Sequence, residues 1–176
     1  MFEINKDFFE NLPRKQKTLL IGIDGCGGAG KSTLAEKIKN TFENITIVQM
    51  DDFYFKDHFD WQRLQKQVLE PLRKNLAAEY QRSDWQTETL AEWHKIKIGG
   101  IVIVEGVYSI RSELADFYDY KIWVETPLEI LLKRGIERDG EMMREKWENV
   151  WMPAEDYYVE NDFPQKRADL IVNGYN

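Results

Sequence analysis

A glycine-rich stretch near the N-terminus constrains the fold of this chain more than any other feature. Residues 25–32, Gly-Cys-Gly-Gly-Ala-Gly-Lys-Ser, match the pattern G-x-x-x-x-G-K-[ST] at every fixed position. An almost continuous apolar run, residues 18–24, precedes the stretch, and residues 32–42 follow it with apolar side chains at helical spacing. Such a run is typical of a strand buried on both faces of a parallel sheet. The sequence therefore predicts a strand, a phosphate-binding loop and a helix in succession.

The rest of the chain alternates between strand and helix patterns. Apolar runs predict further strands at residues 45–50, 101–105, 121–125 and 170–173. Helical spacing predicts helices at residues 61–75, 128–138 and 141–151, with Pro71 expected to kink or end the first of them. Residues 79–98 follow neither pattern and leave room for a short hairpin. This alternation predicts an α/β fold of the P-loop NTPase type: a three-layer sandwich with a mainly parallel sheet and a small helical lid.

The composition is that of a globular domain. With 176 residues, 43% hydrophobic and 31% charged, the chain has the length and apolar content for one domain with a core. Its apolar runs are far shorter than the about 18 residues that cross a membrane, and the charged first 17 residues hold no apolar signal segment. The single cysteine, Cys26, excludes an internal disulfide. We therefore expect a cytoplasmic protein without a membrane partner.

The net charge narrows the class of ligand. A formal charge of −7 argues against a nucleic-acid partner, because proteins that bind a nucleic-acid backbone are usually basic. A few well-placed cations still suffice to hold a small phosphorylated ligand.

Each residue type in the glycine-rich stretch suits the binding of a nucleoside triphosphate. Glycines let successive backbone N–H groups turn inward around phosphate oxygens, and the helix N-terminus adds partial positive charge. We expect Lys31 to face solvent without nucleotide and to stabilise charge on the β- and γ-phosphates, while Ser32 ligates Mg²⁺. The alternative is a glycine-rich turn that only caps a helix. The residues expected to contact the nucleotide are Gly25, Cys26, Gly27, Gly28, Ala29, Gly30, Lys31, Ser32 and Thr33.

Other features narrow the class of triphosphate-binding protein. A GTPase would carry a guanine-binding Asn-Lys-x-Asp late in the chain, whereas Asn5, Lys6 and Asp7 precede the loop and are followed by the wrong fourth residue. The Ser-Gly-Gly signature of transporter ATPases is absent, and the chain is short for a motor or recombinase core. A small-molecule kinase that uses ATP or GTP with Mg²⁺ remains. We expect an N-terminal arm, residues 1–17, followed by a kinase domain, residues 18–176.

Two adjacent carboxylates, Asp51 and Asp52, follow the predicted strand at residues 45–50. Ligands of doubly wound sheets bind at the carboxyl ends of the strands. One carboxylate there can take the proton of an acceptor hydroxyl as it attacks the γ-phosphate. The alternative is a solvated turn in which aspartate acts as a cap. Because adjacent side chains at a strand end point in opposite directions, we expect the two carboxylates to have different roles.

Four segments together resemble the uridine kinase-like family, a group that includes uridine kinase, phosphoribulokinase, pantothenate kinase and nicotinamide riboside kinase. The segments are GCGGAGKST, VQMDDFYF, HFDWQRL with the following VLEPL, and IVIVEGVYSI with LLKRGIERD. They occur in the family's order between residues 20 and 139. The resemblance implies ATP- or GTP-dependent phosphorylation of a nucleoside-like 5′-hydroxyl, as in nucleoside salvage.

The resemblance also implies roles on the acceptor side. The family's base falls on Asp51, with Asp52 as a neighbour that tunes the base or contacts the sugar. The family's ribose-binding aspartate falls on Asp60, which is also a natural helix N-cap.

Further acceptor contacts are expected from the segments on either side of these aspartates. Tyr54 belongs either to the sugar pocket or to the core, and Tyr80 and Arg82 lie where the family places acceptor contacts. His94 does not match the family's histidine near the base, and we expect it at the surface.

Glu105 and two arginines complete the predicted site. Glu105 ends a predicted strand, where a carboxylate can hold the water shell of Mg²⁺ or contact the acceptor. Arg134 and Arg138 are four residues apart and so share one helix face. The resemblance implies that both arginines stabilise charge on the transferred phosphoryl group as catalytic residues. The alternative is a surface ion-pair network formed with Glu129, Glu137 and Asp139.

The functional prediction is a Mg²⁺- and ATP-dependent phosphotransferase that acts on an alcohol group of a nucleoside-like small molecule. One alternative is a nicotinamide riboside kinase or another vitamin or metabolite kinase, because the segment from Gln49 to Phe53 also resembles that branch. An alternative of another class is a regulatory protein that binds nucleotide without turnover, against which the complete loop and its carboxylates argue. A homo-oligomer is compatible with each of these.

Overall fold

The computed structural model describes residues 8–9, 11–55, 58–84 and 87–175. The expected N-terminal arm therefore lies partly outside the described residues; inside them, Phe9 and Leu12 are buried in one of the two cores. The division into arm and kinase domain stays a prediction. Within the described ranges, no helix combines the length and the apolar character that crossing a membrane requires.

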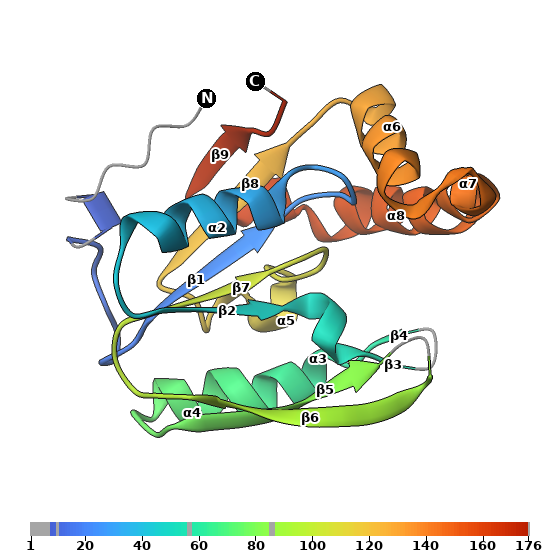
Figure 1. The fold of residues 1–176 in the computed structure, drawn as a ribbon. Coiled ribbons are helices and arrows are strands. Elements are labelled where there is room, and N and C mark those ends of the chain that lie inside the picture. The colour runs from blue at the N-terminus through green and yellow to red at the C-terminus, as the bar shows by residue number, and fades with distance from the viewer. Residues whose placement is uncertain (1–7, 10, 56–57, 85–86, 176) are drawn as a thin grey trace.

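A five-stranded parallel sheet forms the centre of the molecule (Figure 1). Its strands, in chain order, are β1 (Leu19–Asp24), β2 (Ile45–Gln49), β7 (Ile101–Glu105), β8 (Tyr120–Glu125) and β9 (Leu170–Asn173). The spatial order is β2-β7-β1-β8-β9, so the strand that leads into the glycine-rich loop lies in the middle. Every residue of β1 and β7 is buried, as their continuous apolar runs predict. The predicted fold class is confirmed.

Alternate side chains of β1 enter two separate cores, one on each face of the sheet. Ile21 joins the core that is covered by α2 (Lys31–Thr41), where Ile38 lies. Leu20 joins the core on the other face, together with Leu64 from the helix that begins at Trp61. The sheet thus lies between two outer layers, as the three-layer prediction requires.

The layer on the second face combines a bent helix with a hairpin. The helix consists of α3 (Trp61–Leu64), a π turn (Gln65–Leu69) and α4 (Glu70–Arg73). It continues past Pro71 to Arg73, and the π turn that precedes Pro71 is a recognised cause of helix bending. The predicted hairpin is confirmed as β5 (Ala78–Asp84) paired antiparallel with β6 (Thr89–Ile96). The short strands β3 (Tyr54–Phe55) and β4 (His58–Phe59) pair beside it.

The predicted lid helices lie beyond the carboxyl ends of β1 and β8 (Figure 1). They are α6 (Leu128–Asp139) and α7 (Arg144–Lys146), and they are joined by α8 (Met152–Asp162), a helix that the sequence patterns did not predict. The predicted helix at residues 141–151 is less regular than its pattern suggests: it contains a 3-10 turn (Glu141–Met143), α7 and a π turn (Trp147–Trp151) that runs directly into α8. Two short helices, α5 (Ser112–Ala115) and α9 (Pro164–Arg167), complete the fold.

Candidate functional site

The glycine-rich loop joins the carboxyl end of β1 to the start of α2, as predicted. Gly25, Gly28 and Gly30 have φ angles of 149°, 79° and 100°, which side chains of L-residues rarely adopt. A Cβ atom on Gly25 would lie 2.6 Å from the Val124 carbonyl oxygen, and one on Gly28 would lie 2.7 Å from that of Leu131. Glycine is therefore required for both the backbone conformation and the close packing of this loop.

Lys31 does not face solvent, and that expectation is wrong. Its side chain is only 8% exposed, and its ammonium group donates a hydrogen bond of 2.9 Å to the Cys26 carbonyl oxygen across the loop. Its charge also lowers the pKa values of the buried carboxyl groups of Glu105 and Glu155. The buried ammonium group of Lys31 is thus hydrogen-bonded to the loop backbone and lies within the electrostatic field of buried carboxylates.

The two predicted metal ligands lie in contact. The Ser32 hydroxyl, in the first turn of α2, donates a hydrogen bond of 2.9 Å to Oε1 of Glu105, the last residue of β7. Burial raises the pKa of Glu105, and the Lys31 charge and the Ser32 hydrogen bond oppose that rise. A hydroxyl and a carboxylate are hard oxygen ligands, and Mg²⁺ is usually held by one or two protein ligands, with water and phosphate oxygens completing its shell. The pair fits Mg²⁺ in this respect, and among the described residues no cluster of three or more acidic, histidine or cysteine side chains forms an alternative metal site.

Asp51 and Asp52 have different environments, but alternation along a strand is not the reason, and their different roles stay a prediction. They lie on a 3-10 turn (Met50–Phe53) rather than at a strand end, so alternation along a strand does not apply. The Asp51 side chain is exposed and close enough to Glu105 for its charge to raise the pKa of Glu105. The Asp52 carboxylate accepts a hydrogen bond of 2.8 Å from the Tyr80 hydroxyl. Burial raises the pKa of Asp52, and the Tyr80 hydrogen bond lowers it in part.

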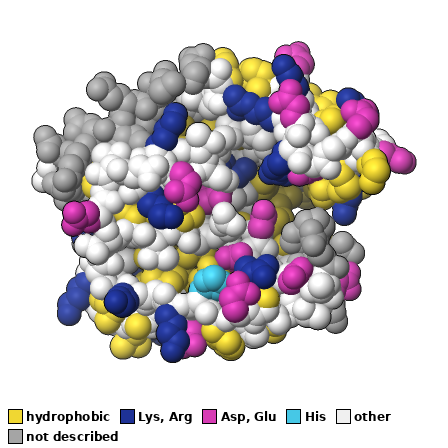
Figure 2. Space-filling model, in the orientation of Figure 1, with side chains coloured by type: hydrophobic (Ala, Val, Ile, Leu, Met, Phe, Trp, Pro, Cys, Tyr) yellow, Lys and Arg dark blue, Asp and Glu magenta, His cyan; other side chains and the backbone are white. Residues whose placement is uncertain are grey.

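Side chains from α3 and the hairpin surround Asp52. Arg63 donates to the Asp52 carbonyl oxygen at 3.0 Å and to the Ser83 hydroxyl at 2.6 Å. The ring of His94, which we expected simply at the surface, is half exposed and stacks on Tyr80 with centroids 5.1 Å apart. Acidic, basic and histidine side chains gather on this face of the molecule (Figure 2). The structure thus places Arg63, Ser83 and His94 around Asp52 and Tyr80, an arrangement that the sequence analysis did not predict.

The other predicted acceptor residues have structural partners in the same region. The Asp60 side chain caps α3 by accepting a hydrogen bond of 3.1 Å from the Arg63 backbone N–H. Tyr54 contacts Phe59 edge to face across the β3–β4 pair, with ring centroids 4.9 Å apart. Arg82 pairs with Glu92 across the hairpin at 2.8 Å. Their roles in acceptor binding stay predictions.

The two predicted arginines of α6 differ in environment. Arg134 reaches the phosphate loop, where its guanidinium donates to the carbonyl oxygens of Gly28 at 3.3 Å and Gly174 at 2.9 Å. Arg138 is mostly exposed, and its guanidinium forms an ion pair of 2.8 Å with the carboxylate of the neighbouring Asp139. This pair is one of those that the alternative of a surface ion-pair network predicts. Only Arg134 is therefore in contact with the loop, and the catalytic role of both residues stays a prediction.

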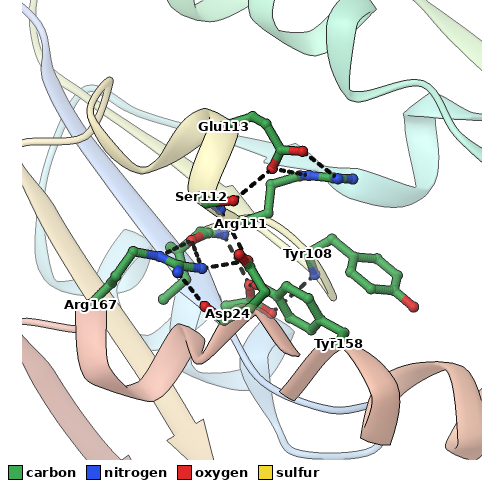
Figure 3. A network of polar contacts seen from close by, with 9 residues as sticks. Asp24, Tyr108, Arg111, Ser112, Glu113, Tyr158 and Arg167 are labelled. Atoms are coloured by element: carbon green, nitrogen blue, oxygen red, sulfur yellow. Dashed lines mark hydrogen bonds and ion pairs between the residues drawn. The ribbon is translucent and has the colours of Figure 1, made fainter. Parts of the chain in front are cut away.

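A buried group behind the loop escaped the sequence prediction. Asp24, the last residue of β1, is fully buried and accepts hydrogen bonds from the backbone N–H groups of Gly25, Tyr108 and Ile110 and from the Tyr158 hydroxyl (Figure 3). Burial raises the pKa of Asp24 to about 6. The signal available in the sequence was a charged residue at the end of an otherwise apolar strand, because such a residue needs partners when buried.

Comparison with known proteins decides the family. The family model described as an AAA domain matches residues 21–154, which is most of the chain. This chain belongs to the AAA domain family.

Relatives also confirm the resemblance that the four sequence segments indicated. Uridine kinase from Macrococcus caseolyticus is 28% identical over 183 aligned positions, which cover 89% of this chain and 88% of that protein. Uridine kinase from Staphylococcus carnosus is also 28% identical, with 88% and 86% covered. A structure described as a possible uridine kinase from Bacillus stearothermophilus shares the fold with a TM-score of 0.71, at 23% identity over 94% of this chain and 93% of that one. The AAA domain match, the named kinases and the shared fold support a P-loop kinase, without specifying the molecule that it phosphorylates.

Proposed function

We propose that this chain transfers the γ-phosphoryl group of ATP, with Mg²⁺, to the hydroxyl group of a nucleoside-like small molecule. The observation that carries the proposal is the meeting of three groups at one edge of the sheet: the phosphate loop, the Ser32–Glu105 contact and the exposed carboxylate of Asp51. The names of the relatives, which are uridine kinases, support a nucleoside as acceptor.

On the donor side, the chain supplies backbone N–H groups and cations. Backbone N–H groups of the loop and of the first turn of α2 bind phosphate oxygens, except those of Gly25 and Gly27, which donate to the carboxylates of Asp24 and Glu155. Lys31 exchanges the Cys26 carbonyl for the β- and γ-phosphates. Ser32 and Glu105 would hold Mg²⁺, which neutralises charge on the phosphates when bound. Arg134 supports the loop from behind through the Gly28 carbonyl.

On the acceptor side, Asp51 acts as the base. The acceptor oxygen attacks the γ-phosphorus, the bond between that phosphorus and the β–γ bridging oxygen breaks, and the acceptor proton passes to the Asp51 carboxylate. ADP and the phosphorylated acceptor are the products. The Asp52 carboxylate already accepts a hydrogen bond from the Tyr80 hydroxyl, so we assign it to positioning the hairpin and the acceptor rather than to proton transfer.

An acceptor panel tests the proposal. ADP release from MgATP is measured with nucleosides, nicotinamide riboside and pantothenate, and against a reaction without acceptor. We expect a nucleoside to raise ADP release and to yield a product carrying one phosphate on its 5′-oxygen. Stimulation by nicotinamide riboside or pantothenate alone would favour the vitamin kinase alternative. Nucleotide binding without stimulation by any acceptor would favour a regulatory protein.

A further inference from the structure

Two buried side chains of α8 face the phosphate loop from the far end of the chain. Glu155 and Tyr158 are three residues apart and so lie on the same face of the helix. Both are buried, whereas Asp156, Tyr157 and Glu160 on the same helix are exposed. A buried carboxylate needs hydrogen-bond or charge partners, so the partners of Glu155 indicate the function of this face of α8.

Glu155 binds the loop backbone directly. Its Oε2 atom accepts a hydrogen bond of 2.9 Å from the Gly27 N–H, across 128 residues of sequence. Its Oε1 atom would lie 3.1 Å from a Cβ on Gly27, so the carboxylate lies closely over this glycine. The charge of Lys31 stabilises the ionised carboxylate, whereas burial and the charges of Asp24 and Asp156 oppose it.

Tyr158 binds the residue immediately before the loop. Its hydroxyl donates a hydrogen bond of 2.7 Å to Oδ2 of Asp24, and Oδ1 of Asp24 accepts one of 2.7 Å from the Gly25 N–H. Figure 3 shows the Tyr158 ring pointing from α8 at Asp24. The two α8 side chains therefore contact Asp24 and Gly27, which flank the first turn of the loop.

We propose that Glu155 is a positioning residue for the nucleotide donor: it holds the first half of the phosphate loop against α8 in its binding form. This inference rests on the proposed function, because it concerns binding of the same triphosphate. Glycine has more backbone freedom than any other residue, and four of the six residues from Gly25 to Gly30 are glycine. A loop of this composition binds phosphate tightly only if its shape is fixed before the ligand arrives. Glu155 supplies that constraint at Gly27, which has no side chain of its own to pack.

Substitutions at Glu155 separate this role from a general effect on folding. The affinity for MgATP is measured by titration calorimetry, which needs no acceptor, for Glu155→Ala, Glu155→Asp, Glu155→Gln and the exposed control Glu160→Gln. We expect about tenfold weaker binding for Glu155→Ala, the size that corresponds to losing a hydrogen bond to a charged group. Glu155→Asp, whose shorter side chain withdraws from Gly27, should weaken binding similarly. Glu155→Gln keeps an acceptor oxygen and should bind within about threefold of the unmodified protein.

A kinetic comparison excludes a merely structural effect. At saturating ATP, turnover of the variants should approach that of the unmodified protein, so the change falls on KM for ATP and not on kcat. If the unmodified protein itself binds no MgATP, the proposed function fails and the inference fails with it. If the unmodified protein binds MgATP and both Glu155→Ala and Glu155→Asp bind it equally well or more tightly, the proposed function stands and the inference is overturned. Equal weakening by Glu155→Gln and Glu155→Ala would also overturn it.

Discussion

Replacing Gly27 by alanine tests how the lid packs on the phosphate loop. Gly27 is not among the glycines with positive φ, so alanine fits its backbone. A Cβ at this position would lie 2.5 Å from Cη2 and 2.8 Å from Cζ3 of Trp147. That ring is 2% exposed, it packs against Gly135 as well, and its Nε1 donates a hydrogen bond of 3.0 Å to Asp139. The ring therefore has little room to move away from the added methyl group.

The expected cost follows from this overlap. Overpacking a well-packed core costs about 1–3 kcal/mol. For a chain of this size, each kcal/mol lowers the midpoint of thermal unfolding by about 2–4 °C, so Gly27→Ala should lower it by about 2–12 °C. Circular dichroism measures that midpoint, and Trp147→Phe provides the matched background, because phenylalanine lacks the outer ring atoms that approach Gly27.

The reasoning requires the two substitutions to be coupled. Trp147→Phe alone should destabilise the protein by leaving space, but Gly27→Ala should cost less when added to it than in the unmodified protein, with the remaining cost at Glu155 Oε1, which would lie 3.1 Å from the added Cβ. An equal loss in both backgrounds would refute the packing argument and would assign the cost to the Glu155 contact or to the loop backbone instead.

Four further substitutions test the charges around the loop. Lys31→Met keeps the bulk of the side chain but removes its charge, and should lower turnover by about 10²–10³ in a steady-state assay. Arg134→Ala should lower both turnover and the unfolding midpoint, because Arg134 binds the loop backbone. Arg138→Ala should leave the midpoint within about 1 °C, because the Arg138 side chain of its ion pair is mostly exposed. Equal midpoints for the two variants would contradict this expectation. Burial raises the pKa of Asp24 from 3.8 to about 6, so the folded protein keeps a proton that the unfolded chain has lost, and stability should fall as the pH rises from about 4 to about 6. Asp24→Asn should reduce that decrease in urea unfolding measured at a series of pH values, although Asp52, Glu105 and Glu155, whose pKa values burial also raises, contribute in the same direction. An unchanged slope would show that Asp24 does not contribute to it.

Short-range patterns predicted the parts of the site that are built from consecutive residues. The phosphate loop follows from its own eight residues, because glycines, a lysine and a serine at fixed spacing suit one conformation. The sequence also predicted that Ser32 and Glu105 lie close together, because both were expected to bind Mg²⁺. Glu105 ends β7, and Ser32 starts the helix that follows the loop after the neighbouring parallel strand β1, so both lie at the edge of the sheet where ligands bind.

Contacts between distant segments could not be predicted in the same way. The bond from Glu155 to Gly27 depends on where α8 lies, and α8 follows a π turn and a 3-10 turn that have no simple periodicity. Strand geometry predicted that Asp51 and Asp52 point in opposite directions, but the two residues lie on a 3-10 turn. The charges that surround Lys31 belong to Glu105 and Glu155 on other elements, which the local sequence does not contain.

The central claim is that Asp51, and not Asp52, takes the proton of the acceptor at the edge of the phosphate loop. Turnover with the acceptor that the panel identifies, together with the affinity for MgATP, tests it in Asp51→Asn and Asp52→Asn. Asp51→Asn keeps the size of the side chain but removes the base, so we expect turnover to fall by about 10²–10⁴ with ATP affinity nearly unchanged. Asp52→Asn should mainly raise KM for the acceptor, because it disturbs the hydrogen bond from Tyr80. An active Asp51→Asn enzyme beside an inactive Asp52→Asn enzyme would contradict the account.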